Sequence, residues 1–288
     1  MNYLAPAKIN LNLLVESRDE GGHHPLRSLV QTLEWCDRLS LVRGDSDDLD
    51  VNGADVPDDD SNLVLRAVRE FRKLAPVPPL SMSLEKNVPV AAGLGGGSAD
   101  AAAALVACCE VTGQPRSRAF EVAPAIGADV SVLIDGGTAE MSGYGERVEK
   151  LPALDGFALA IVVPDFELST AAVYRRWDEI GEPVGFEVPE RFLPPVLRGL
   201  PIRNDLHRAA VDLEPALGDF IRDVSSTWDG VALLTGSGPA CFGFFATADE
   251  AAEAANSIPS TRASVGVELR SVGVEKVASE EDEPWTRS

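Results

Sequence analysis

Residues 89–100 constrain the fold more than any other segment of this sequence. They place four glycines within residues 93–97, and an alanine-rich stretch that predicts a helix follows from about 98 to 111. Glycine tolerates positive φ and lets a ligand approach the backbone closely. A helix that begins at such a loop directs unpaired N–H groups and its positive dipole end into the loop, which favours phosphate. The segment therefore predicts a phosphate-binding turn, although a purely structural turn would contain similar glycines.

This loop differs from the two most familiar nucleotide motifs. The Walker pattern, which ends in Gly-Lys-Ser or Gly-Lys-Thr, is absent. A dinucleotide-binding loop would need a βαβ unit with an acidic residue about 20 positions later, and that pattern is also missing. The loop therefore indicates phosphate binding by a different fold.

Hydrophobic periodicity predicts a mixture of strands and helices with no internal repeat. Apolar patterns predict strands at 8–16, 29–35, 39–42, 80–84, 157–163, 231–235, 241–245 and 265–272, and a hairpin at 136–149. Helical spacing and capping residues predict helices at 62–73, 98–111, 206–224 and 248–257. An exposed hairpin or loop is expected at 43–61, and an irregular connection at 179–201. We therefore expect domains at 1–155 and 156–276, followed by an acidic tail at 277–288.

The net charge and the composition argue against nucleic-acid and membrane partners for this protein. The chain has 25 Lys and Arg against 46 Asp and Glu, a net charge of −21, whereas a nucleic-acid partner requires a basic footprint. The N-terminus shows no leader pattern, and no apolar run is long enough to span a bilayer, so we expect a cytoplasmic protein with no membrane partner. The four cysteines follow no metal-binding spacing, so no dedicated metal site is expected.

Three further segments contain residues that could bind an anion or move a proton. Lys8 is either an edge lysine that reaches solvent or a cation directed into a cleft. Asp129 either caps a helix or acts as a general base. The Gly-Ser-Gly turn within 233–241 suits either a plain hairpin or a second anion contact. The residues by themselves leave each pair of alternatives open.

Taken together and in this order, the four segments resemble those of the GHMP kinases, the family of galactokinase and of homoserine, mevalonate and phosphomevalonate kinases. Residues 5–10 (Ala-Pro-Ala-Lys-Ile-Asn) resemble the family's first motif, 86–105 its second and 234–242 its third, and 127–130 resemble the segment with its catalytic aspartate. Shorter matches lie at 22–26, 33–37, 61–64, 169–174 and 204–206. The resemblance covers about residues 5–245, and the order and spacing of the motifs make it more specific than any single motif.

The resemblance implies a fold and a reaction. The fold would be α+β with two domains, the first similar to domain 2 of ribosomal protein S5 and the second ferredoxin-like, with the active site in the cleft between them. The reaction would transfer the γ-phosphoryl group of ATP to an alcohol. The closest match is the branch that phosphorylates the 2-hydroxyl of a cytidine-diphosphate-linked methylerythritol in the non-mevalonate route to isoprenoid precursors. A kinase of the homoserine or mevalonate type is the alternative.

The resemblance also implies a role for particular residues. Lys8 and Asp129 would be catalytic, with Asp129 accepting the hydroxyl proton and Lys8 beside both groups. The ATP site would comprise Asn62, Leu63, Lys86, Pro89, Val90, Ala91, Ala92, Gly93, Leu94, Gly95, Gly96, Gly97, Ser98, Thr235, Gly236, Ser237 and Gly238, with the first three bordering the adenine. The substrate site would comprise Asn10, His23, His24, Thr170 and Tyr174. Magnesium would be held mainly through phosphates, and the protein would be a monomer or a weak homodimer.

One short motif departs from the family pattern. The family usually has Asp-Gly-Tyr-His where this chain has Gly21-Gly-His-His24, so His23 replaces an aromatic wall of the cytosine site. An imidazole can still stack on a base, with less area than a phenol. We therefore expect His23 and Tyr174 to enclose the cytosine ring. A protein with this fold and no turnover would be expected to lack Lys8 or Asp129, and both are present.

Overall fold

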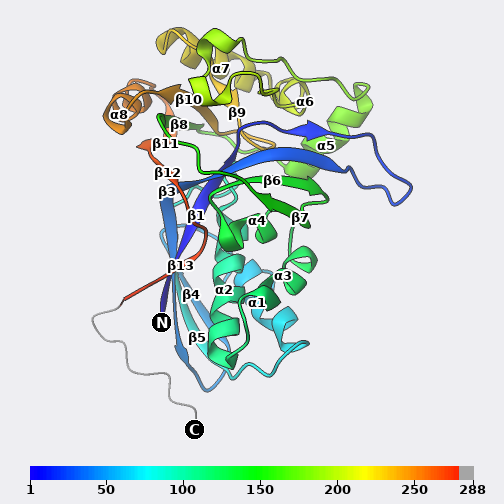
Figure 1. The fold of residues 1–288 in the computed structure, drawn as a ribbon, viewed down its shortest axis with the longest axis vertical. Helices are drawn as coiled ribbons and strands as arrows, with labels where there is room; N and C mark the ends of the chain where they lie inside the picture. Colours follow the sequence, from blue (N-terminus) through cyan, green and yellow to red (C-terminus); the bar gives the residue numbers. More distant parts are fainter. Residues whose placement is uncertain (279–288) are drawn as a thin grey trace.

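The computed structural model describes residues 1–278 of the chain and has two sheets arranged along its long axis (Figure 1). The larger sheet, here the N-terminal sheet, has nine strands, and the smaller C-terminal sheet has four. The expected acidic tail at 277–288 lies, apart from its first two residues, outside the described residues. Within residues 1–278, no helix is both long and apolar enough to cross a membrane.

The N-terminal sheet is organised around β3 (Leu26–Arg43), which pairs with β1 (Asn2–Asn10), β2 (Leu14–Val15), β5 (Leu80–Glu85), β6 (Thr138–Gly143) and β12 (Leu269–Arg270). The two strands predicted at 29–35 and 39–42 are therefore one strand. The predicted strand at 8–16 begins earlier, at Asn2, and ends at Asn10. The remaining strands are β4 (Asp48–Asn52), β7 (Arg147–Lys150) and β13 (Glu275–Val277).

The segment 43–61, expected to be an exposed hairpin or loop, contains strand β4. This strand pairs in parallel with β5 at the sheet edge. It has only two apolar residues, Leu49 and Val51, among aspartates, so its alternation is too short to stand out in the sequence. The prediction gave neither the position of this strand nor its partner β5, because sheet pairing depends on distant residues and outweighs a weak local preference.

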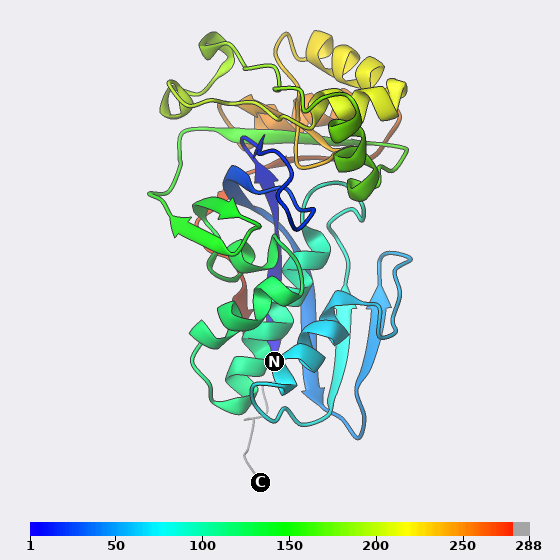
Figure 2. The same ribbon diagram turned by 90° about the vertical axis from the view of Figure 1, so that its right-hand side faces the viewer.

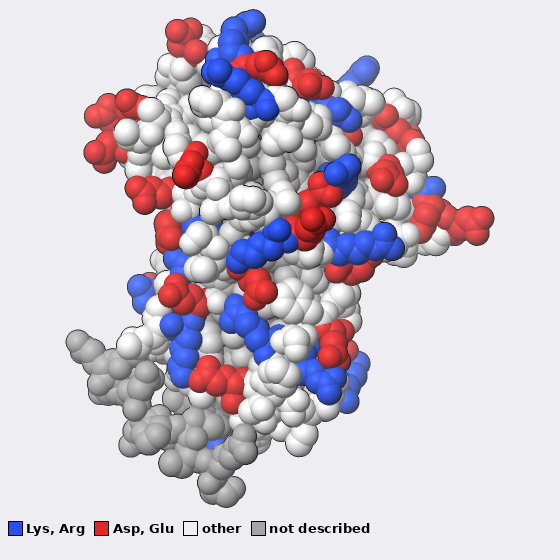
Figure 3. Space-filling model, in the orientation of Figure 1, with Lys and Arg blue, Asp and Glu red and all other residues white. Residues whose placement is uncertain are grey.

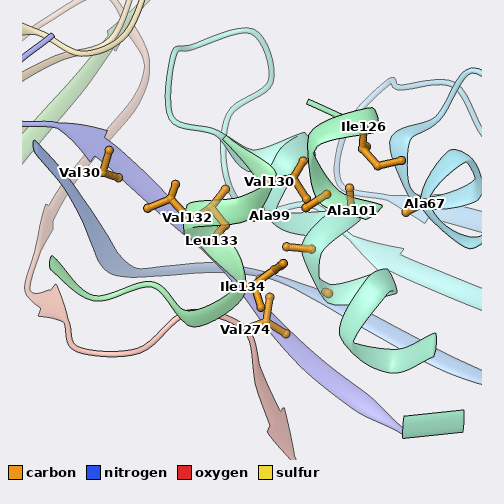
Figure 4. Close-up of a cluster of buried hydrophobic side chains, with 14 of the residues drawn as sticks. Val30, Ala67, Ala99, Ala101, Ile126, Val130, Val132, Leu133, Ile134 and Val274 are labelled. Carbon is orange, nitrogen blue, oxygen red and sulfur yellow. The ribbon is translucent and has the colours of Figure 1, made fainter. Parts of the chain in front are cut away.

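Four helices cover one face of the N-terminal sheet: α1 (Leu63–Arg72), α2 (Gly96–Thr112), α3 (Ser117–Val122) and α4 (Val130–Asp135), with a short 3-10 turn, η1 (Ala123–Ala125), between α3 and α4 (Figure 2). Helix α1 begins and ends one residue inside the predicted range 62–73, and its N-cap Asn62 accepts from the N–H of Val64. Helix α2 is buried on nearly all sides rather than on the single face predicted, and its alanines let the sheet and the other helices approach closely. Figure 4 shows Ala99 and Ala101 of α2 within this core, beside Val130 and Leu133 of α4.

The C-terminal sheet has the strand order β11-β8-β10-β9, built from β8 (Ala158–Pro164), β9 (Leu233–Leu234), β10 (Cys241–Phe245) and β11 (Thr261–Val267). Its helices are α5 (Thr170–Glu179), α6 (His207–Leu213), α7 (Pro215–Thr227) and α8 (Ala248–Asn256), and the segment between α5 and α6 contains the 3-10 turns η2 (Glu190–Phe192) and η3 (Pro195–Leu197). The order β-α-β-β-α-β is that of ferredoxin-like folds. The helix predicted at 206–224 is divided because Pro215 begins a new helix that Glu214 caps.

Strand β8 contributes to a different hydrophobic core on each of its faces. Side chains alternate across a strand, so Ala158, Ala160 and Val162 pack in the same core as the helices. Leu159, Ile161 and Val163 pack instead with β1 and β3 residues such as Ile9 and Leu33. A second hydrophobic core therefore lies between the domains and fixes the C-terminal turns against β1. The last strands, β12 and β13, pair with β3 and β1, so residues 269–277 belong to the N-terminal sheet rather than to the expected C-terminal domain.

Candidate active site

A cavity of about 590 Å³ lies where the glycine loop, β1 and the C-terminal turns meet. Most of the residues predicted to bind ATP or substrate line it: Lys8, Asn10, Asn62, Leu63, Lys86, Pro89, Val90, Ala91, Ala92, Gly93, Leu94, Gly95, Gly96, Gly97, Ser98, Asp129, Thr170, Tyr174, Gly236 and Ser237. Thr235 and Gly238 lie directly behind that wall, and His23 and His24 are not among the lining residues.

Lys8 and Asp129 form an ion pair in this cavity, with Lys8 Nζ 3.1 Å from Asp129 Oδ2. The Lys8 ammonium also donates to Asn10 Oδ1 at 2.7 Å, and its side chain is only 4% exposed, so Lys8 is not a solvent-reaching edge lysine. Asp129 stands at the N-cap position of α4, yet its side chain makes no capping hydrogen bond. The carboxylate points instead to Lys8, which favours the catalytic alternative over the capping one.

The glycine loop adopts positive φ at Gly93 (82°) and Gly95 (72°). A Cβ at Gly95 would lie 2.8 Å from Lys8 Cγ, and a Cβ at Gly93 would lie 2.5 Å from the carbonyl oxygen of Thr235, so both positions require glycine. Among the described residues, the N–H groups of 91–98 have no backbone acceptor. These amides precede and begin α2, so the loop presents free donors to an anion.

The turn at 235–238 is fastened to β1 and to the glycine loop. Thr235 Oγ1 accepts from the N–H of Asn10 at 2.9 Å, and Ser237 Oγ lies 2.8 Å from Thr170 Oγ1. The buried Asn204 donates through Nδ2 to the carbonyls of Leu234 and Gly236, both at 2.8 Å. Asn204 therefore holds the turn, a role that the sequence match at 204–206 did not reveal.

Beneath the loop, Lys86 is enclosed by two buried carboxylates. Its ammonium binds Asp37 and lies 2.7 Å from Asp100 Oδ2. Asp37 also accepts from the N–H groups of Asn87 and Val88, so it is well satisfied, whereas Asp100 Oδ1 is buried without a partner among the described residues. Burial raises the pKa of Asp100 to about 7, although the Lys86 charge opposes this. Lys86 lines the cavity with its ammonium already engaged, and sequence reasoning missed both aspartates.

At the other end of the cavity, the structure pairs Tyr174 with His24 rather than with His23. The His24 ring stacks on Tyr174 with centroids 5.6 Å apart and meets Trp177 edge-on at 5.3 Å. Burial, with the charge of Asp129, holds the pKa of Tyr174 above its usual value, so the phenol stays neutral. His24 Nε2 lies 3.1 Å from Asp178 Oδ1.

His23 has Tyr144 as its ring partner. Its ring lies 6.0 Å from that of Tyr144, edge to face, and Tyr144 donates its hydroxyl to Asp19. The expected enclosure of a base between His23 and Tyr174 is therefore not formed in this structure. Sequence reasoning missed Tyr144, whose only signal is its place between two glycines in the β6–β7 turn.

Comparison with known proteins shows which family has the sequence and the fold described above. The model of the GHMP kinases N terminal domain matches residues 62–140, and that of the GHMP kinases C terminal matches residues 202–263. A 4-diphosphocytidyl-2-C-methyl-D-erythritol kinase from Caulobacter sp. (strain K31) is 38% identical over 284 residues, covering 91% of this chain and 94% of the relative. The chain belongs to the GHMP kinase family. A relative of the same name from Geobacter metallireducens is 36% identical, covering 88% of this chain and 92% of the relative.

Solved structures of GHMP kinases agree with the fold. The structure titled 4-(cytidine 5'-diphospho)-2C-methyl-D-erythritol kinase superposes with a TM-score of 0.74 at 32% identity, covering 93% of this chain and 99% of that one. A homoserine kinase from Cytophaga hutchinsonii has a TM-score of 0.68 at 16% identity, covering 96% of each chain, and shows the fold alone. The two-domain α+β fold and the family resemblance are thus confirmed.

Proposed function

We propose that this GHMP kinase is an ATP-dependent 4-diphosphocytidyl-2-C-methyl-D-erythritol kinase, which phosphorylates the 2-hydroxyl of its substrate in the non-mevalonate route to isoprenoid precursors. The observation that carries this proposal is the Lys8–Asp129 pair at the end of a loop of free amides, in one cavity. Relatives of that name, 35–39% identical and matched over most of this chain, support the choice of substrate.

In this reaction, the substrate oxygen forms a bond to the γ-phosphorus while the bond between that phosphorus and the β,γ-bridging oxygen breaks, releasing ADP. Asp129 accepts the hydroxyl proton. Lys8, 3.1 Å away, offsets the negative charge that develops on the attacking oxygen. The loop amides and the dipole of α2 stabilise charge on the phosphates. Phosphoryl transfer requires mainly positioning and charge stabilisation, which a set of fixed amides and one ion pair provides.

Charge balance in the cavity favours a nucleotide that brings its own magnesium. Lys8 is paired with Asp129, and Lys86 with Asp37 and Asp100, so neither lysine is free to neutralise a triphosphate. No group of three or more metal-ligating side chains is found in residues 1–278. Mg²⁺ binds readily through one or two protein oxygens plus substrate phosphates. Ser98 and Asp129 supply side-chain oxygens in the cavity wall, so they fit an ion held mainly by phosphate, which would add charge neutralisation there.

The aromatic end of the cavity favours a nucleobase over a small alcohol such as homoserine or mevalonate. Tyr174 is a neutral aromatic ring that lines the cavity, with His24 stacked against it. We propose that Tyr174 stacks on the cytosine, that His24 and Thr170 help to hold the substrate, and that Asn10 orients the reacting end beside Lys8. His23 and Tyr144 then form an outer rim that would have to move to touch the base.

A substrate panel tests the proposal. The purified protein is supplied with magnesium and ATP, and ADP release is followed with the cytidine substrate, homoserine or mevalonate as acceptor. We expect turnover with the cytidine substrate at a kcat/KM at least about 100-fold above the others, since a site built for a base leaves polar groups unpaired without it. Preferred turnover of homoserine or mevalonate would contradict the proposed substrate and leave the kinase chemistry standing.

We further propose that the protein works in the cytoplasm as a monomer or weak homodimer, without nucleic-acid or membrane partners. The net charge of −21 supports this, because an acidic surface repels both phosphate backbones and anionic lipids. On the face in Figure 3, acidic and basic side chains lie interspersed.

A further inference from the structure

A cation from the C-terminal domain contacts the outer side of the glycine loop. Arg262, on β11, donates through Nη2 to the carbonyl oxygen of Val90 at 2.8 Å and lies 3.4 Å from that of Ala91. Its Nη1 donates to Glu167 at 3.3 Å, and Glu167 is 64% exposed. Its Nε is buried without a partner among the described residues. The guanidinium thus turns its buried edge toward the loop and its other edge toward solvent.

The backbone that Arg262 holds is strained. Ala91 has a φ of 52°, in the left-handed region that residues other than glycine rarely adopt. Such a conformation persists only where the surroundings over-determine it. The contact with Arg262 is one such constraint, since it fixes the peptide units on both sides of Ala91.

Because the peptide bond is planar, a contact that fixes a carbonyl group also fixes the direction of the N–H group in the same peptide unit. In a trans peptide, the C=O of one residue and the N–H of the next point in opposite directions. Arg262 holds the carbonyls of Val90 and Ala91, so the N–H groups of Ala91 and Ala92 must point away from it. The same logic applies along the loop: the N–H of Ala240 donates to the Ala92 carbonyl at 3.1 Å, and that of Lys8 donates to the Leu94 carbonyl at 2.9 Å. The orientation of the free N–H groups of the loop is therefore set by the groups that donate hydrogen bonds to its carbonyl oxygens.

We propose that Arg262 is a positioning residue for ATP, which acts from the C-terminal domain by aiming the amides of Ala91 and Ala92 at the phosphates. This inference rests on the proposed nucleotide site and not on the identity of the alcohol. Arg262, Ala240 and Lys8 each donate a hydrogen bond to a loop carbonyl. Of these three donors, Arg262 alone donates through its side chain, so it can be substituted without changing a backbone hydrogen bond.

Nucleotide binding without turnover tests the proposal. Affinity for Mg-ADP and for a non-hydrolysable ATP analogue is measured by calorimetry for wild type, Arg262→Met, Arg262→Lys and the charge-matched control Arg222→Met. Arg222 is 71% exposed and pairs with Asp219 within one helix. We expect Arg262→Met to bind nucleotide about tenfold more weakly, the effect of losing one charge-assisted hydrogen bond, and Arg262→Lys to lose less. The control should match wild type, and in a separate turnover assay with Mg-ATP the KM of the alcohol should move less than about twofold.

A rescue separates positioning from a general structural role. Glycine adopts a φ of 52° without strain, so Ala91→Gly in the Arg262→Met background should recover part of the lost affinity. If Arg262→Met does not fold, Arg262→Lys replaces it in the test. Its smaller expected loss of nucleotide affinity should likewise be partly recovered by Ala91→Gly. Three outcomes would overturn the proposal. The first is nucleotide affinity within twofold of wild type in both Arg262→Met and Arg262→Lys. The others are an equal weakening of nucleotide affinity and of the KM for the alcohol, and no recovery of affinity by Ala91→Gly. A wild-type protein that binds nucleotide but rejects the cytidine substrate would contradict only the proposed substrate, whereas one that binds no nucleotide would overturn both.

Discussion

At the scale of single residues, the site depends on a few buried polar contacts between elements far apart in sequence. Lys8 comes from β1 and Asp129 from the turn before α4, and their 3.1 Å contact is the geometry that a proton acceptor beside a cation requires. Tyr174 comes from α5 of the other domain. Each of these side chains is held by its own element, so single substitutions can separate their roles.

Asp129→Asn should lower kcat by about 10²–10⁴-fold and leave nucleotide affinity nearly unchanged, because the amide keeps the shape and one oxygen for a phosphate-held ion but accepts no proton. Steady-state kinetics and calorimetry measure the two quantities. Asp135→Asn, at the exposed end of the same helix, is the matched control and should behave as wild type. A near wild-type kcat for Asp129→Asn would remove this residue from the mechanism.

The two aromatic positions of the substrate end should differ in their effect on the cytidine substrate. Tyr174→Leu keeps the volume of the side chain and removes its ring, so the KM should rise roughly 5- to 100-fold, the range expected for losing a base–aromatic stack. His23→Ala should raise the KM less, because His23 is exposed and contacts Tyr144 rather than the cavity. If His23→Ala has the larger effect, the loop at 19–24 rearranges on binding and the originally expected enclosure of the base is restored.

At the scale of elements, the glycine loop and α2 act as one unit. Gly96 is the first residue of α2, so the positive φ that a phosphate loop needs belongs to Gly93 and Gly95. The close approach of Gly95 to Lys8 also couples the loop to the Lys8 side chain. The element therefore sets the phosphate position and the Lys8 position together.

Gly95→Ala should weaken ATP binding by about tenfold or more, because left-handed backbone costs an L-residue about 1–2 kcal/mol and the new Cβ meets Lys8. Gly97→Ala is the comparison, since a Cβ there would meet only Leu63 Cδ1 at an ordinary 3.6 Å. Its loss should be much smaller. Equal losses in the two variants, measured by calorimetry, would mean that any side chain in the loop blocks phosphate and that φ is not the cause.

At the scale of the whole molecule, buried charge joins the sheet to the helix layer. Asp37 lies on β3, Lys86 follows β5 and Asp100 lies on α2, so this triad links three elements around one ammonium group. A buried carboxylate with one unpaired oxygen is costly when ionised. The stability of the fold should therefore depend on the protonation of Asp100.

Asp100 should make the protein less stable as the pH rises toward neutrality. Its pKa is raised to about 7 in the fold, whereas in the unfolded chain it is near 3.8. Between these values the folded state binds a proton that the unfolded state lacks, so the stabilising contribution is complete below about pH 4 and is lost through pH 7. Its full size is on the order of a few kcal/mol.

Denaturant unfolding of wild type and Asp100→Asn between pH 5 and 8 isolates this contribution. The difference in unfolding free energy, wild type minus variant, should fall as the pH rises, because the amide does not titrate. Asp135→Asn, which changes an exposed carboxyl, should give no such slope. A difference independent of pH would mean that Asp100 stays ionised throughout, with Lys86 sufficient to hold it.

Local patterns determined much of the molecule. The glycine loop followed by alanines, the Thr247 cap, the β6–β7 hairpin and the all-apolar β8 lie where the sequence predicts them, because each depends on residues close by in the sequence. The order of the motifs also identified the family, and it predicts Lys8 and Asp129 as the catalytic pair. These features need no knowledge of distant contacts.

Only the tertiary structure decided the rest. It joined the two predicted strands into β3, made a strand of 48–52, and returned residues 269–277 to the first sheet, because pairing partners lie far away in sequence. It also enclosed Lys86 between Asp37 and Asp100, turned His23 toward Tyr144, and placed Arg262 against the loop. Contacts of charged and aromatic side chains depend on proximity in space, within about 3 to 6 Å. A local sequence pattern does not specify which distant carboxylate, ring or carbonyl the folded chain places at that distance.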